Sequence, residues 1–239
     1  MNTGQRSGRT QIVALPPATK QAGFWSAVLA TCCSVVYIAA QLAEWQGWLG
    51  SAGGPESAST PLGLAVLLTP SLLLGSSFLV LMVSVHHVSA ADRKVWSHSA
   101  LAFAIAYTVL ISLVYYVQLT LVAPRIAQGR TAGIEVLLFE PFDSLLYAVD
   151  MLGYSFMSVS TLLAGSALTG RSQRRARVWL TANGLLLPFL ALQMYWPVLI
   201  WPAALWALTF PATTVSLASM FHRMQASPHA IFEVEHWNR

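Results

Sequence analysis

The stretch from Asp143 to Thr161 reads DSLLYAVDMLGYSFMSVST. On a helix its polar residues fall three or four positions apart and share one face, while the leucines take the other faces. This polar face holds Asp143, Tyr147, Asp150, Tyr154, Ser158 and Thr161. Inside a membrane, an ionised Asp150 is unfavourable by roughly 2.5–3.5 kcal/mol unless it faces protein or water. The stretch therefore predicts a membrane helix whose polar stripe faces the interior of a bundle.

The composition around this stretch is that of a membrane protein. Of the 239 residues, 56% are hydrophobic and 9% are charged, and the mean hydropathy is +0.59. This leaves too little polar surface for a soluble domain. The net charge of +4 comes from basic residues in short segments between apolar runs, a pattern that orients membrane helices and does not indicate nucleic-acid binding. We expect a multi-pass protein of the cell membrane, of the bacterial inner-membrane type.

Six apolar runs approach or exceed the roughly 20 residues that a membrane helix needs. They cover residues 24–43, 62–85, 100–123, 145–168, 178–196 and 198–221. A cleaved signal peptide is the alternative for the first run, but its long leading segment and its length favour a retained helix. Residues 126–142 are too few to cross, and we expect an interfacial segment between the third and fourth helices.

These runs predict an all-α fold, a bundle of six transmembrane helices in one domain over residues 23–222. Residues 1–22 are expected to form a disordered cytoplasmic tail, and residues 223–239 a second cytoplasmic tail. Basic residues support this arrangement, since most of them fall in segments on one side of the six runs. The positive-inside rule then places both termini in the cytoplasm.

With this topology, four helices place polar side chains in the outer half of the membrane, since each residue adds about 1.5 Å of depth. We therefore predict a polar cavity that opens outward, with residues 134–139 as its roof. The residues expected to bind a ligand there are Tyr37, Gln41, Tyr115, Gln118, Tyr147, Tyr154 and Gln193. Tyrosines near a membrane surface can also be interfacial residues without a further role.

Two acidic residues carry the chemistry that the sequence allows. Asp150 and Glu44, if they share the cavity, could exchange protons with a ligand and would be the catalytic residues of an enzyme. The alternatives without a functional role are a structural hydrogen bond or ion pair for Asp150 and a solvated helix end for Glu44. The leading hypothesis is binding or transport of a small lipophilic or polar molecule. The alternatives are an intramembrane acid/base enzyme, of isomerase or cyclase type with a lipophilic substrate, and a structural subunit without a site.

Other motifs exclude several functions. The sequence has no nucleotide-binding loop, nucleophile elbow, redox cysteine pair or zinc signature. His86, His87, His98 and His222 fall near one membrane surface, where a metal or a haem is geometrically compatible, but their spacing matches no known metal motif. We expect no metal and no cofactor. Membrane lipids, which the basic segment 171–177 could contact, and other membrane subunits are the expected partners.

Overall fold

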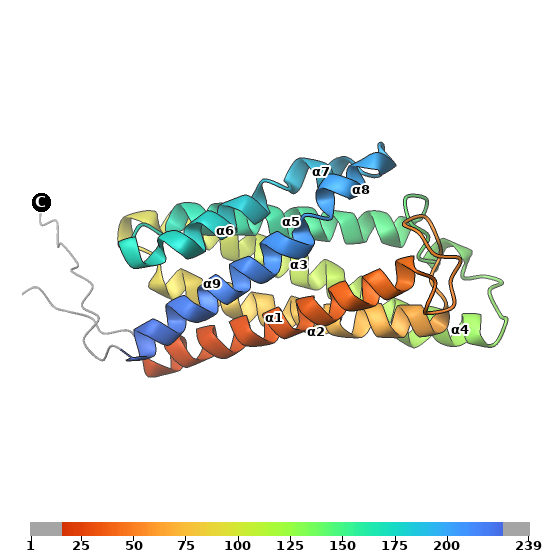
Figure 1. Ribbon diagram of the computed structural model, residues 1–239, viewed down its shortest axis with the longest axis horizontal. Coiled ribbons are helices and arrows are strands. Elements are labelled where there is room, and N and C mark those ends of the chain that lie inside the picture. The colour runs from red at the N-terminus through yellow and green to blue at the C-terminus, as the bar shows by residue number, and fades with distance from the viewer. Residues whose placement is uncertain (1–15, 227–239) are drawn as a thin grey trace, which may run out of the picture.

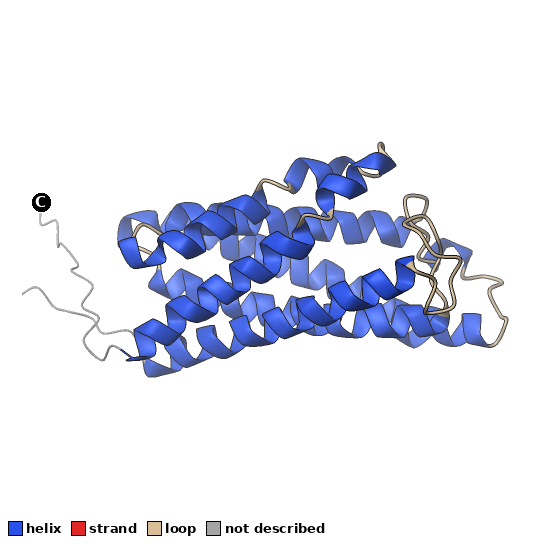
Figure 2. Cartoon of the chain, viewed as in Figure 1, coloured by secondary structure: helices blue, strands red, loops and turns tan. Residues whose placement is uncertain are grey.

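The computed structural model describes residues 16–226, and within that range the chain is helical with no strand (Figure 2). The expected all-α fold class is confirmed. The longer helices pack lengthwise into a bundle (Figure 1), and they are α1 (Pro17–Trp45), α2 (Pro61–Val88), α3 (Lys94–Val117), α5 (Leu145–Ala167), α6 (Arg174–Gly184) and α9 (Trp206–Ala226). The shorter segments are η1 (Ala91–Arg93), η2 (Gln118–Val122), α4 (Ala123–Ala127), η3 (Glu135–Leu137), η4 (Arg171–Gln173), α7 (Leu187–Leu192), η5 (Pro197–Leu199) and α8 (Ile200–Ala203).

Five helical segments are long and apolar enough to cross a membrane: Pro17–Trp45, Pro61–Val88, Ala91–Ala127, Leu145–Ala167 and Pro197–Ala226. Their outward faces expose large apolar side chains, among them Val36, Leu113 and Val215. Such a surface is stable against lipid and not against water. The chain is therefore a multi-pass membrane protein, as the composition predicted.

The prediction of one continuous helix over residues 178–196 is wrong, because the segment breaks between α6 and α7. Pro188 has no N–H to donate to the carbonyl of Gly184, and its ring would clash with that carbonyl in a regular helix. Leu185 and Leu186 form a turn instead. Gly184 also packs so closely on α5 that an added Cβ would lie 2.6 Å from the Cβ of Leu162. The segment α6–α7 is thus a sixth, interrupted path along the bundle.

The two ends of the described chain lie together. Lys20 donates a 2.9 Å hydrogen bond from Nζ to the carbonyl of Met224, so α1 begins beside the end of α9 (Figure 1). An even number of crossings places both ends on the same side of the membrane, which allows this contact. The predicted tail boundaries are wrong, because α1 already begins at Pro17, a residue suited to the first helical position, and α9 continues to Ala226. The rest of both predicted tails lies outside the described residues.

Basic side chains at this end of the bundle, which we call the basic end, contact the carbonyl ends of helices. Lys20 of α1 contacts the end of α9, as described above. Lys94 donates from Nζ to the carbonyl of His86 near the end of α2, at 2.5 Å. Arg177 donates to the carbonyl of Leu168 after α5, at 3.5 Å. A cation at a helix C-terminus satisfies free carbonyls and interacts favourably with the helix dipole. These residues therefore stabilise the helix ends as well as orienting the chain.

The centre of the bundle is an aromatic core. Phe78 packs edge-on against Tyr107 with ring centroids 5.5 Å apart, and Phe210 lies 6.0 Å from Phe78. All three side chains are fully buried. Trp206, one turn before Phe210 on α9, stacks on the ring of Phe210 with centroids 5.0 Å apart. This core supports the site described next, because Trp206 belongs to both.

Candidate functional site

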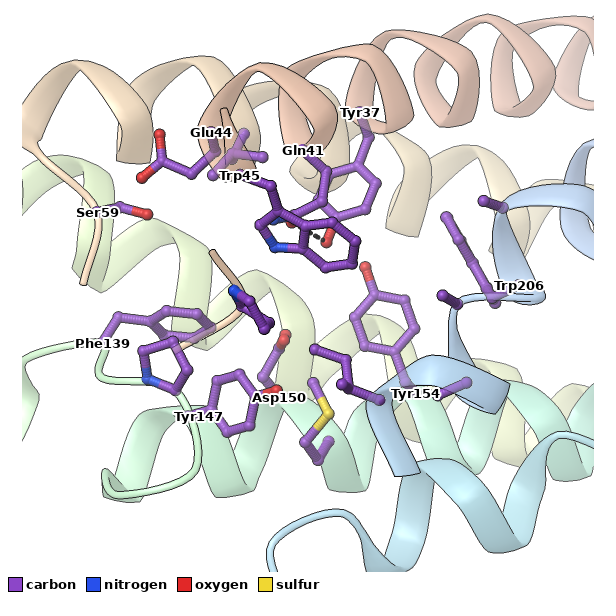
Figure 3. Close-up of a pocket in the computed structure, with 18 of the residues that line it drawn as sticks. Tyr37, Gln41, Glu44, Trp45, Ser59, Phe139, Tyr147, Asp150, Tyr154 and Trp206 are labelled. Carbon is purple, nitrogen blue, oxygen red and sulfur yellow. Dashed lines mark hydrogen bonds between the residues drawn. The ribbon is translucent and has the colours of Figure 1, made fainter. Parts of the chain in front are cut away.

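A cavity of about 370 Å³ lies at the end of the bundle opposite the basic end, and we call this the pocket end. It is lined by α1, α2, α3, α5, α7, α8 and α9 and by two loops (Figure 3). Most of the residues that the sequence assigned to a site are brought together here. They are Tyr37, Gln41, Glu44, Tyr115, Tyr147, Asp150, Tyr154 and Gln193.

Helix α5 supplies the polar stripe of this cavity. Its N-cap is Ser144, whose hydroxyl accepts a 3.2 Å hydrogen bond from the backbone N–H of Tyr147. Tyr147, Asp150 and Tyr154 then recur at helical spacing, and all three are buried. Gly153 fixes the rotation of the helix, because an added Cβ there would lie 2.9 Å from a methyl group of Ile111 on α3. The close α3–α5 contact therefore turns the stripe inward.

Three rings from different helices form one wall of the cavity. The ring of Trp206 is perpendicular to Tyr37 of α1, with centroids 5.7 Å apart, and nearly perpendicular to Tyr154 of α5, at 5.8 Å. Edge-to-face contacts of this kind are favourable beyond the area that they bury. The wall is thus rigid, apolar and aromatic.

The tyrosine hydroxyls of the cavity are largely satisfied by neighbouring side chains. Tyr37 donates to Oε1 of Gln41 at 3.0 Å, and Tyr115 donates to the hydroxyl of Tyr154 at 3.2 Å. Tyr147 donates to Oε1 of Gln193 at 3.5 Å. The amide nitrogen of Gln193 contacts the sulfur of Met151, a second lining residue of α5. These pairs fix the polar side chains in place before any ligand arrives.

The two carboxyl groups differ from the tyrosines because three of their four oxygens are buried without a hydrogen-bond partner in residues 16–226. Asp150 is 4% exposed and its Oδ1 atom has no hydrogen-bond partner within residues 16–226. Glu44 is 2% exposed, and neither of its oxygens has a partner in that range. None of the described residues that line the cavity is Lys, Arg or His. Buried polar atoms are normally satisfied, so these acids need a proton, water or a ligand.

Glu44 and Asp150 occupy different parts of the cavity. Figure 3 shows Glu44 turned toward Ser59, and Asp150 on the opposite wall beside Tyr147. The Glu44 carboxyl also packs against the first turn of α2, where a Cβ added to Gly63 would lie 2.8 Å from Oε2. The free N–H groups of a helix N-terminus carry partial positive charge, which favours an ionised carboxylate there. Glu44 thus has some electrostatic support, whereas Asp150 has none of this kind.

The roof of the cavity is built from two loops. Phe139 and Pro141 follow η3 and line the cavity, and the ring of Phe139 lies 5.4 Å from that of Tyr147. Gln118, which the sequence placed among the ligand-binding residues, does not line the cavity. Its amide nitrogen instead donates to the carbonyl of Leu137 at 2.7 Å, and so holds this loop in place. The second loop, residues 46–60, was not expected to contribute.

Several lining residues were not identified from the sequence as members of the site. Residues 46–60 supply Gly54, Pro55, Ser57 and Ser59, and the helices add Trp45, Met151 and Trp206. Trp45 directly follows Glu44, and its position at a helix end is the only signal that could have indicated it. Trp206 reaches the cavity because the chain turns at residues 204–205 before α9 begins. That turn does not follow from the apolar run that contains it.

Comparison with known proteins adds a family. The family described as CcmB protein matches residues 106–227, which is just over half of the chain. The chain belongs to the CcmB protein family. CcmB proteins are multi-pass proteins of the cell membrane with a role in transport, which agrees with the helices found here. No curated protein and no solved structure matches the chain.

The CcmB match covers only part of the cavity. It includes Tyr115, Asp150 and Gln193, and it runs from within α3 to the end of α9. The helices α1 and α2 precede it, so Tyr37, Gln41 and Glu44 lie outside the CcmB match. One part of the lining thus lies within the residues that match the CcmB family, and the other part, from α1 and α2, lies before them.

The histidines within residues 16–226 lie away from the cavity, toward the basic end. Nδ1 of His86 is 2.9 Å from the hydroxyl of Ser97, and the rings of His86 and His98 are 4.2 Å apart. His222 instead packs against Phe24 at 5.7 Å. In the described part of the chain, no group of three or more His, Cys, Asp or Glu side chains is placed to hold a metal ion.

Proposed function

We propose that this CcmB protein is the membrane-embedded subunit of a transporter, and that the cavity holds its ligand, a small lipophilic or polar molecule. The observation that carries the proposal is the meeting of polar side chains from α1, α3, α5 and the segment after α7 in one cavity with apolar walls. Ligand sites in helical bundles have this construction, with a few placed polar groups among apolar ones. The proposed site faces outward, because the positive-inside rule puts the basic end in the cytoplasm.

The family suggests how such a subunit is driven. CcmB proteins are membrane subunits of an ABC-type haem exporter. Residues 1–239 contain no nucleotide-binding loop, so ATP would be hydrolysed by a part of the transporter outside these residues. We therefore propose that the protein associates with other subunits, with the ATPase on the cytoplasmic side. The aromatic core under Trp206 would separate the cavity from that side.

An intramembrane acid/base enzyme is the second candidate, favoured by the buried Asp150, whose Oδ1 atom has no partner in the described residues. Acid/base chemistry on one substrate usually needs two titratable groups aimed at the same reacting atoms. Here Glu44 turns toward Ser59 on the other side of the cavity (Figure 3). Binding and transport therefore explain the arrangement better than catalysis does.

Filling the cavity tests this proposal. Ala204 lines the cavity, whereas Leu208, four residues later, is 62% exposed on the outer surface. We expect Ala204→Phe to reduce the amount of lipophilic molecule that copurifies with the protein by at least tenfold. Leu208→Phe, the control, should leave this amount unchanged. The measurement is mass spectrometry of extracts from protein in lipid nanodiscs. Equal extracts from wild type and both monodisperse variants would refute a ligand site.

A further inference from the structure

We infer that the cavity takes an amphipathic cation: an amine or quaternary ammonium group on an apolar, preferably aromatic, body. This inference rests on the proposed function, since it names the substrate class of the same cavity. It is argued from three properties of the lining: its charge, its remaining hydrogen-bonding capacity and its rings.

The charge of the lining is acidic and uncompensated. Asp150 and Glu44 are both buried. Neither forms an ion pair, because the ion pair found in residues 16–226 joins Arg93 to Asp92, at 3.4 Å. A carboxylate that stays ionised in an apolar surrounding without a partner is strongly unfavourable. Because the described bundle supplies no cation here, the counter-charge comes with the ligand, and a proton occupies the site when the ligand is absent.

Among the fully buried atoms of the lining, the hydrogen-bonding capacity left for a ligand is mostly that of an acceptor. The hydroxyls of Tyr37, Tyr115 and Tyr147 already donate to neighbouring side chains. The fully buried lining atoms without a partner are Oδ1 of Asp150, both carboxyl oxygens of Glu44 and the indole N–H of Trp206. One indole N–H cannot neutralise an anion, whereas a free carboxylate oxygen such as Oδ1 of Asp150 matches a cationic donor.

The rings of the lining also suit a cation. Seven aromatic residues face the cavity: Tyr37, Trp45, Tyr115, Phe139, Tyr147, Tyr154 and Trp206. The faces of such rings attract ammonium groups, and enclosed aromatic sites commonly bind quaternary ammonium. Figure 3 shows Tyr154, one ring of the aromatic wall, beside Asp150, so a ring face and the carboxylate can act on one group.

Haem, the cargo of the family's exporter, fits this lining poorly. Haem carries two carboxylates and an iron that prefers nitrogen or sulfur ligands. Among the described residues of the lining there is no basic side chain, no histidine and no cysteine. Its carboxylates would face Asp150 and Glu44 without compensation. The chain therefore belongs to the CcmB protein family but has a cavity whose lining favours a cation over an anion such as haem.

Glu44 and Asp150 have different roles in this cavity. Glu44 packs on the N-terminus of α2, whose partial positive charge supports it without a ligand. Asp150 lacks such support and stands beside the aromatic wall, so it is the residue that receives the cationic group. Asp143, near the start of the same polar stripe, is exposed and does not line the cavity, which makes it a matched control.

The test uses two probes of nearly equal shape, phenyltrimethylammonium and its uncharged counterpart tert-butylbenzene, with haemin as the anionic probe. Binding to the full chain in lipid nanodiscs is measured by equilibrium dialysis. We expect wild type to bind the ammonium probe at least tenfold more tightly than tert-butylbenzene, and haemin no better than empty nanodiscs. Asp150→Asn should weaken ammonium binding at least tenfold and leave tert-butylbenzene unchanged, while Asp143→Asn should change neither.

Measurements on wild type alone can refute the inference, so the test remains valid if the Asp150→Asn variant does not fold. Equal or tighter binding of tert-butylbenzene or haemin by wild type would refute a cation site. Unchanged ammonium binding in a folded Asp150→Asn variant would also refute it. In both cases the cavity still binds a molecule, and the proposed function stands. If Ala204→Phe affects no probe and no copurifying molecule, the proposed function fails, and this inference fails with it.

Discussion

Asp150 and Glu44 are both buried carboxyl groups, but their neighbours give them different properties. Asp150 sits on the polar face of α5 among tyrosines whose hydroxyls are already engaged. Glu44 sits at the end of α1, against the first turn of α2, in space that exists because residue 63 is glycine. The same type of side chain is thus a free acceptor in one place and a packed interhelical contact in the other.

Gly63→Ala tests the packing of Glu44. The added methyl group would overlap the Glu44 carboxyl, and we expect a loss of roughly 1–3 kcal/mol in the free energy of unfolding, as for other overpacked sites. Thermal unfolding in nanodiscs measures the change. Gly75→Ala, on the same helix with its nearest neighbour at 3.8 Å, is the control and should be neutral.

A second variant shows whether Glu44 causes the loss. Shortening the side chain in the double variant Gly63→Ala with Glu44→Ala should restore part of the stability, because the clash disappears. If the two changes are simply additive, the methyl group at position 63 does not act through Glu44.

At the scale of elements, the cavity lies where the helices stop being regular. Pro188 separates α7 from α6, and the turn at residues 204–205 separates α9 from α8. The end of α3 passes into η2, in which the N–H of Ala123 bonds to the carbonyl of Gln118, five residues earlier. Pro124 promotes this shift, because it cannot donate to the carbonyl four residues before it. The segments that follow the breaks after α6 and α8 line the cavity through Leu190, Gln193 and Trp206.

A buried polar link holds the interrupted helix to its neighbours. Asn183 donates to the hydroxyl of Thr161 on α5 at 3.2 Å and accepts from Thr209 on α9 at 3.1 Å. We expect Asn183→Leu to lower the free energy of unfolding by roughly 0.6–1.7 kcal/mol, the range for interhelical hydrogen bonds in membranes. Ser166→Ala, at an exposed site bonded only within its own helix, should have no effect in the same unfolding experiment. Equal losses in both variants would deny the link a role.

At the scale of the whole molecule, the bundle has two unlike ends. Basic side chains contact the ends of α2, α5 and α9 at one end, and aromatic rings and carboxyl groups line the cavity at the other. Figure 1 shows the loop after α1 at the pocket end. The positive-inside rule converts this polarity into an orientation, with the pocket end on the outer side. A ligand would then enter beneath the loops 46–60 and 134–142.

Cysteine labelling in intact cells tests this orientation. In a background with Cys32 and Cys33 replaced by alanine, we expect Ser57→Cys in the first loop to react with a membrane-impermeant maleimide added outside. Ser172→Cys, in the segment that joins α5 to α6, should react only after the cells are opened. The opposite result would place the cavity on the cytoplasmic side.

The sequence by itself determined the class of the molecule and most of the polar side chains that line the cavity. Apolar runs of about 20 residues can be stable only as membrane helices, and polar residues at helical spacing within them must face inward, since lipid cannot satisfy them. This reasoning placed Tyr37, Tyr115, Asp150 and Gln193 in the same half of the bundle before any coordinates. It could not establish what the site binds.

Only the tertiary structure decided how the helices break and where the individual side chains turn. A proline such as Pro188 permits a break, but the close packing of Gly184 on Leu162 helps to fix where the chain bends. Gln118 lies at the expected depth, yet it faces the carbonyl of Leu137 instead of the cavity. Trp206 enters the site through a turn that hydropathy does not reveal. Depth follows from position along the chain, whereas direction depends on contacts between residues far apart in sequence.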